Sequence, residues 1–127
     1  MHAVPSGSCR GLHAAVARQP VAVAVNMESN KAFQHYSGGV FTGACTTNTN
    51  HAVLVIGYGT SGGTRFWRIK NSWGSKWGEH GYVRIERDVK DGPGKCGIQK
   101  DAVFPIKNTP NPSPTPMPGA VSPERCC

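Results

Sequence analysis

The sequence lacks several features that would assign it quickly to a class of protein. None of its apolar runs approaches the ~18 residues that a membrane-spanning helix needs, and the first thirty residues show no signal peptide pattern. Acidic residues are scarce, with 7 Asp and Glu against 14 Lys and Arg for a net charge of +7. The basic residues are scattered and no row of aromatic residues accompanies them. We therefore expect a solvated basic surface, with no nucleic-acid partner and no membrane partner.

Metal-binding spacings are also missing. None of the five cysteines, at positions 9, 45, 96, 126 and 127, forms C-x-x-C, and the five histidines show no metal-ligand spacing. The sequence thus predicts no metal site and no cofactor. Five cysteines are many for a cytosolic domain of this size, so a disulfide in an oxidising compartment is expected. Because such a protein must be exported and no export signal is visible, we expect the chain to be a piece of something larger.

Apolar patterns predict one short helix and several short strands. Residues 11–19 place apolar side chains on one face of a helix of about two turns, which Pro20 ends. The predicted strands are 21–25, 52–56, 66–70, 82–87 and an edge strand at 104–106. The run at 52–56 is continuously apolar and is therefore expected to be buried on both faces. A long loop is predicted over 27–50, and the whole pattern favours an antiparallel sheet or barrel.

The composition changes sharply after Lys107. The stretch TPNPSPTPMPGAVSP holds six prolines in fifteen residues, which cannot form a packed core. We expect a domain over 1–108, a semi-rigid polyproline-II linker over 109–125, and at Cys126 and Cys127 the start of a truncated Cys-rich module.

The glycines Gly57, Gly59 and Gly62 spell G-x-G-x-x-G after an apolar run, the written form of a dinucleotide-binding turn. That site needs a helix directly after the glycines, whereas 66–70 has the character of a strand. The glycines are better explained as the turn of a β-hairpin that joins 52–56 to 66–70.

His51 stands where a polar loop enters the strand 52–56. Alone, it fits a structural histidine better than a catalytic one. In a hairpin centred near residue 61, however, Asn71 would face it, and an amide can fix the orientation and tautomer of an imidazole. Trp73 follows closely enough to shield that hydrogen bond from water.

Several spaced motifs then resemble one family. N50-H51-A-V-x-x-x-G-Y-G and K70-N71-S-W-G-x-x-W-G-E-x-G-Y82 are similar to the C-terminal half of papain-like cysteine proteases. Q19-P-V, G38-G-V-F-x-G-x-C45 and C96-G-I stand in the same order, so the resemblance runs from about Val4 through Asn108. The Pro-rich linker resembles that of plant and algal members with a granulin-like module.

The resemblance implies an α+β family fold, of which this chain is mostly the antiparallel, β-barrel-like right-hand domain. It implies that His51 is the general base and acid of a cysteine endopeptidase, that Asn71 orients it, and that Trp73 shields the pair. It also implies a disulfide between Cys45 and Cys96. The compartment it implies is a vacuole, a lysosome or the extracellular space.

The same resemblance places a substrate side-chain pocket around Ala24, Asn50, Ala52 and Asp101. An acid at its base, Asp101, would favour basic substrate residues there. Peptides or proteins are the substrates that the family implies.

The family's nucleophile has no counterpart in the sequence. Cys9 follows Ser6-Gly-Ser as a nucleophile would, but Arg10 stands where the family has tryptophan, so Cys9 is expected to be an unpaired surface thiol. Gln19 belongs to the Q-P-V entry of a strand and is no oxyanion donor.

Without a thiolate, the His51–Asn71 pair has nothing to activate, and the chain alone is expected to be inactive. The implied partner is the missing N-terminal half or a separate light chain. The alternative is a non-catalytic papain-like homologue that binds peptides or a protease partner.

Overall fold

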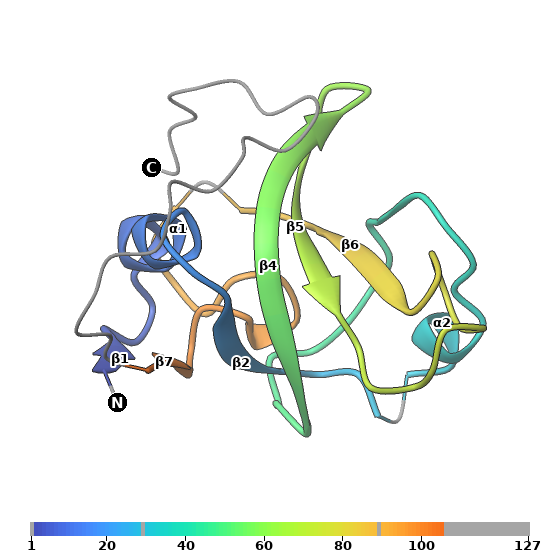
Figure 1. The fold of residues 1–127 in the computed structure, drawn as a ribbon, viewed down its shortest axis with the longest axis horizontal. Helices are drawn as coiled ribbons and strands as arrows, with labels where there is room; N and C mark the ends of the chain where they lie inside the picture. Colours follow the sequence, from blue (N-terminus) through green and yellow to red (C-terminus); the bar gives the residue numbers. More distant parts are fainter. Residues whose placement is uncertain (1, 29, 89, 106–127) are drawn as a thin grey trace.

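The computed structural model describes residues 2–28, 30–88 and 90–105. Its main element is a seven-stranded sheet in the order β1-β7-β2-β4-β5-β6-β3 (Figure 1). The strands are β1 His2–Val4, β2 Val21–Val25, β3 Val40–Phe41, β4 His51–Ser61, β5 Thr64–Lys70, β6 Tyr82–Glu86 and β7 Ala102–Phe104. Neighbouring strands are antiparallel, except that β3 lies parallel to β6. The predicted mostly antiparallel sheet is confirmed.

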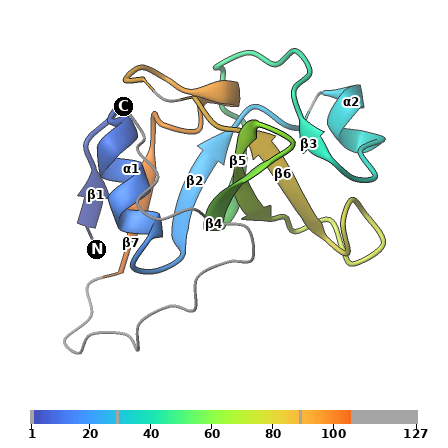
Figure 2. The same ribbon diagram turned by 90° about the horizontal axis from the view of Figure 1, so that it is seen from above.

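The predicted first helix is present, with shifted ends. Helix α1 spans Cys9–Val16, because the Ser8 side chain accepts a hydrogen bond from the backbone N–H of Gly11 and so caps the helix start. Leu12 and Val16, one helical turn apart, are buried. Figure 2 shows α1 beside β1 and β7 at one end of the sheet. In the described part of the chain, no helix is long and apolar enough to cross a membrane.

Strands β4 and β5 form the predicted hairpin, but its turn is tighter than expected. Ser61 pairs with Thr64, so only Gly62 and Gly63 form the turn. Both have positive φ, 56° and 83°, as a two-residue hairpin turn requires. Gly59 lies inside β4, where a Cβ atom would come 2.9 Å from the Phe66 ring. The glycines thus serve a hairpin, and a strand rather than a helix follows them.

The prediction that 52–56 is buried on both faces is wrong. Val53 and Val55 are buried in the core, whereas Ala52 is exposed and Leu54 and Ile56 are only half-buried. A continuous apolar run therefore forms a strand with one face in the core and a second apolar face that is partly open.

The segment 27–50 is more regular than the predicted loop. It contains helix α2, Lys31–Gln34, capped by the side chain of Asn30, and strand β3. Phe33 is fully buried, and its ring stacks on Phe41 with centroids 3.9 Å apart. Elements this short produce no periodic pattern in the sequence, so the sequence did not reveal them.

The last predicted strand lies elsewhere. Strand β7 covers Ala102–Phe104 and is not an edge, since it lies between β2 and β1. Strand β1 was not predicted. Ile106, the linker 109–125 and the cysteines at 126 and 127 fall outside the described residues.

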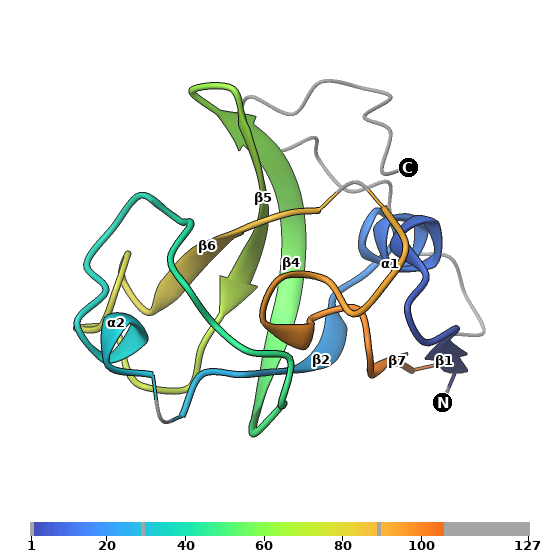
Figure 3. The same cartoon turned by 180° about the vertical axis from the view of Figure 1, so that it is seen from behind.

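Cys45 and Cys96 form a disulfide, as the resemblance implied, with Cα atoms 5.2 Å apart. The bond ties the segment that leads into β4 to the 3-10 turn η1, Lys95–Gly97. Figure 3, seen from behind, shows this segment passing beside η1 on its way to β4. The disulfide therefore anchors the segment that leads into β4 to a distant part of the chain.

Candidate active site

The side chains of His51 and Asn71 meet at the end of the β4–β5 hairpin. The Nε2 atom of His51 lies 2.7 Å from Oδ1 of Asn71, so the predicted contact is present. The two residues are diagonal neighbours rather than directly opposite. Leu54 pairs with Lys70, and continuing this register by one residue places Asn71 opposite Val53. A β-bulge between Val55 and Gly57, which the sequence did not reveal, shifts the register.

Three contacts fix the Asn71 amide. Its Oδ1 also accepts a hydrogen bond of 2.7 Å from the backbone N–H of Ser72, and its Nδ2 donates to the Sδ atom of Met27 at 3.3 Å. A backbone N–H can only donate, so the atom that faces His51 is an oxygen. The Nε2 atom of His51 must therefore carry a hydrogen, which leaves Nδ1 for other chemistry. Asn71 is only 7% exposed, so this arrangement is shielded from water.

Tryptophan side chains cover this pair. The Trp73 ring lies 5.3 Å from the His51 ring between centroids, and Trp77 meets Trp73 edge-on at 5.1 Å. The Nε1–H group of Trp77 donates to the backbone carbonyl of Phe33 at 2.8 Å. The loop after β5 is thereby tied to α2.

An ion pair holds the far end of the same loop. Arg84 on β6 donates from Nε and from a terminal nitrogen to the two carboxylate oxygens of Glu79, at 2.9 and 2.8 Å. Glu79 also accepts a hydrogen bond from the Gly39 backbone N–H. The Arg84 guanidinium lowers the pKa of Glu79, and burial raises the pKa of Tyr36 beside them. Charge-assisted bidentate pairs of this kind add geometric precision to a loop.

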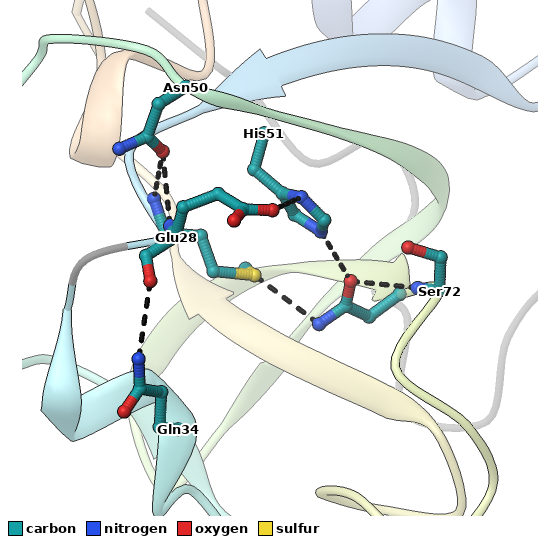
Figure 4. A network of polar contacts seen from close by, with 7 residues as sticks. Glu28, Gln34, Asn50, His51 and Ser72 are labelled. Atoms are coloured by element: carbon teal, nitrogen blue, oxygen red, sulfur yellow. Dashed lines mark hydrogen bonds and ion pairs between the residues drawn. The ribbon is translucent and has the colours of Figure 1, made fainter.

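The Nδ1 side of His51 has a partner that sequence reasoning missed. The Oε1 atom of Glu28 lies 2.7 Å from Nδ1 (Figure 4). Oδ1 of Asn50 accepts hydrogen bonds of 3.0 Å from the backbone N–H groups of Met27 and Glu28. Met27 and Glu28 lie outside the motifs that pointed to His51 and Asn71. The sequence therefore gave no signal that they contact the site.

The predicted pocket residues are only partly brought together. Ala24 pairs with Ala52 across β2 and β4, and its backbone N–H donates to the carbonyl of Asp101 at 3.2 Å. Asn50 instead turns its side-chain oxygen towards the backbone of residues 27 and 28. The pocket itself stays a prediction.

Two residues near the N-terminus are placed away from these contacts. Cys9 is fully buried at the start of α1 and is disulfide-bonded, so the expectation of an unpaired surface thiol is wrong. Gln19 donates from its side chain to the Pro105 carbonyl, with no link to His51. Among the described residues, no group of three or more His, Cys, Asp or Glu side chains could hold a metal ion.

Comparisons with known proteins identify the family of the chain. Residues 1–106 match the model of the papain family cysteine proteases. Cysteine proteinase COT44 of Brassica napus is 50% identical over 109 residues, which are 86% of this chain and 33% of the relative. The probable cysteine protease RD21B of Arabidopsis thaliana is 45% identical over 127 residues, which are 98% of this chain and 27% of the relative.

Solved structures show the same fold. Bromelain of Ananas comosus, in complex with the E64 inhibitor, is 48% identical with a TM-score of 0.72, covering 79% of this chain and 46% of that chain. The proform of the ragweed pollen protease Amb a 11 is 44% identical with a TM-score of 0.80, covering 87% and 34%. The chain spans about a third of the length of its curated relatives. This chain belongs to the papain family of cysteine proteases.

Proposed function

We propose that this chain supplies the histidine and asparagine half of a cysteine endopeptidase active site. The observation that carries the proposal is the 2.7 Å contact between His51 Nε2 and Asn71 Oδ1. Because the Ser72 N–H fixes Oδ1 as the facing atom, Nε2 is committed as a donor and Nδ1 is the nitrogen that can exchange a proton. A cysteine thiol placed at Nδ1 would lose its proton to the ring and become a nucleophile.

The reaction then follows from the two states of His51. The thiolate attacks the carbonyl carbon of the scissile peptide bond, and Nδ1–H donates its proton to the leaving amine nitrogen as the C–N bond breaks. The neutral ring next takes a proton from water, whose oxygen attacks the thioester, so that the C–S bond breaks, the new carboxyl group leaves and the thiolate is restored beside the protonated ring. Asn71 holds the ring in one orientation through both steps, and the Trp73 and Trp77 rings keep water from this hydrogen bond.

The thiolate in this proposal comes from a second half, either a preceding part of one polypeptide or a separate light chain. The proposed substrates are peptides or proteins. Residues 1–108 would form the half-domain, with a Pro-rich linker over 109–125 and a Cys-rich module beginning at 126.

The proposed substrate pocket consists of Ala24, Asn50, Ala52 and Asp101. The backbone hydrogen bond between Ala24 and Asp101 supports the proximity of two of its members. Asp101 is exposed, so its carboxylate could meet a basic substrate side chain. If Asp101→Ala leaves the preference for Arg over Leu unchanged in an active enzyme, this part of the proposal fails.

The proposal is tested by completing the site. Residues 1–127 are joined to the part of Ananas comosus bromelain that precedes the matched region; we call the product the completed enzyme. It should hydrolyse a fluorogenic dipeptide substrate, and an alkylating inhibitor should abolish turnover. His51→Ala should be inactive, and Glu86→Ala, a carboxylate on β6, is the matched control. A folded completed enzyme without turnover would contradict the proposal.

One observation favours a second candidate, a non-catalytic homologue that binds peptides or a protease partner. The Glu28 carboxylate already occupies Nδ1, the position that a nucleophile needs. Turnover by the completed enzyme would count against this candidate, because it would show that the Glu28 carboxylate does not block Nδ1.

A further inference from the structure

The imidazole of His51 is held from both ends by acceptor atoms. Nε2 faces the amide oxygen of Asn71 and Nδ1 faces the carboxylate of Glu28, each at 2.7 Å. Neither facing oxygen carries a hydrogen when the carboxylate is ionised, so both ring nitrogens must donate. The two contacts have the geometry in which both ring nitrogens can donate. Hydrogen bonds between two charged groups are the stronger kind.

The backbone that carries Glu28 is fixed at three points. Asn50 Oδ1 accepts from the backbone N–H groups of Met27 and Glu28 at 3.0 Å. Gln34 Nε2 donates to the backbone carbonyl of Glu28 at 3.2 Å (Figure 4). Met27 is fully buried and receives the Nδ2 hydrogen bond of Asn71 through its sulfur. One short segment therefore contacts both members of the His51–Asn71 pair.

The Glu28 side chain itself is far less confined than the backbone. It is 52% exposed, against 9% for the side chain of His51. Its torsions can rotate the carboxylate into solvent without moving the backbone that Asn50 and Gln34 hold. The carboxylate can therefore bind Nδ1 or leave it, while the ring and its partner Asn71 stay in place.

We propose that Glu28 is a positioning residue for His51, which holds Nδ1 in place of the nucleophile and yields that position when a thiolate arrives. The inference rests on the proposed function, because it assigns Nδ1 to the thiolate. A carboxylate and a thiolate are both anions, so they cannot both occupy one N–H donor. The ring would then keep its working orientation whenever the thiolate is not at Nδ1.

The first test uses the chain of residues 1–127 and the ring N–H resonances of His51 in nuclear magnetic resonance spectra. Glu28→Ala should remove the Nδ1–H resonance or speed its exchange with water by about tenfold or more, the protection expected of a charge-assisted hydrogen bond. The Nε2–H resonance should persist. Asn71→Ala should produce the opposite pattern, and Glu86→Ala, the same substitution on β6, should change neither.

An Nδ1–H resonance that Glu28→Ala leaves unchanged would overturn the proposal. Circular dichroism checks that each variant is folded, and Glu28→Gln, which keeps the shape of the side chain but removes its charge, replaces Glu28→Ala if that variant does not fold.

The second test uses the completed enzyme. There the thiolate should hold Nδ1, so Glu28→Ala should leave the Nδ1–H resonance in place. Loss of that resonance would overturn the idea that Glu28 yields its position. A completed enzyme without turnover would contradict the proposed function. The spectra of residues 1–127 would still show whether Glu28 contacts His51.

Discussion

The two nitrogens of His51 are held by different kinds of structure. Asn71, on the Nε2 side, follows a central strand, is 7% exposed and is fixed by three hydrogen bonds. Glu28, on the Nδ1 side, stands in a loop with 52% of its side chain exposed. The partner of Nε2 is therefore buried and fixed, whereas the partner of Nδ1 is an exposed side chain that can move without disturbing Asn71.

This difference suits an imidazole that must keep its orientation while its second partner changes. A proton can pass between Nδ1 and a thiol only if the Glu28 carboxylate can leave Nδ1. Nε2 must meanwhile stay bound, because a ring that rotates loses the geometry of transfer. Under the proposed role of Glu28, the sheet supplies the permanent contact and the loop supplies the replaceable one.

The largest effect is expected from the disulfide. Replacing Cys45 and Cys96 by serine should lower the free energy of unfolding by about 4 kcal/mol, since the bond closes a loop with a sequence separation of 51. The Cys96 carbonyl accepts the backbone N–H of Asn26, next to the segment that carries Glu28. Hydrogen exchange in that segment should therefore rise more than in β5. Urea denaturation measures the stability, and a loss below about 1 kcal/mol would contradict this account.

Comparing two asparagines sharpens the contrast between the sides of the ring. Asn71→Ala should cost about 2 kcal/mol, because it removes a buried amide and leaves partly buried donors unpaired at His51 and Ser72. Asn50→Ala removes hydrogen bonds that lie in an exposed loop and should cost about 1 kcal/mol or less. Equal losses in thermal or urea unfolding would show that the two sides are equally rigid.

Trp77→Phe should cost about 1 kcal/mol. The variant keeps most of the aromatic contact with Trp73 but loses the 2.8 Å hydrogen bond to the Phe33 carbonyl. Its effect should be confined to the tryptophan loop, which amide hydrogen exchange can resolve. Faster exchange at the Glu28 segment than in that loop would argue against the proposed division.

The smallest effect is expected from acid, which should weaken the Glu79–Arg84 pair in the loop after β5 and so lower the stability of the fold slightly. Arg84 lowers the pKa of Glu79 from its ordinary value of 4.5, so the folded state binds this proton less readily than the unfolded one. The stabilisation is therefore present above pH 4.5 and is lost as the pH falls through the lower, folded pKa. Glu79→Gln should flatten the fall in stability below pH 4.5, measured by urea unfolding at several pH values. An unchanged slope would show that the Glu79–Arg84 pair does not stabilise the loop.

Sequence patterns predicted the side of the site that belongs to the sheet. The hairpin follows from the apolar run 52–56, the strand-like run 66–70 and the glycines between them, and it brings Asn71 within reach of His51. The bulge after Val55 was beyond such patterns, because it depends on how β4 fits against both β2 and β5. The direct pairing was not found because the turn lies at Gly62 and Gly63 rather than near residue 61, and the bulge then brings Asn71 one residue closer to His51.

The Nδ1 side could not be predicted. Its geometry depends on Asn50 capturing the backbone of residues 27 and 28, a contact between a side chain and a distant loop. The prediction that 52–56 is buried on both faces failed for another reason. Composition shows that both faces of a strand are apolar, but not whether other parts of the chain cover them both. Cys9 similarly looked like a surface thiol beside Arg10, but its place at the start of α1 buries it.

The most direct test of the central claim is the rate at which iodoacetamide alkylates the nucleophilic thiol of the completed enzyme at pH 6. A free thiol with a pKa of about 8.5 is only about 0.3% ionised at that pH, so a thiolate paired with His51 should react far faster. We predict that His51→Ala slows alkylation by roughly 10²-fold, with Glu86→Ala unchanged. Equal rates with and without the imidazole would contradict the claim that His51 activates a thiolate.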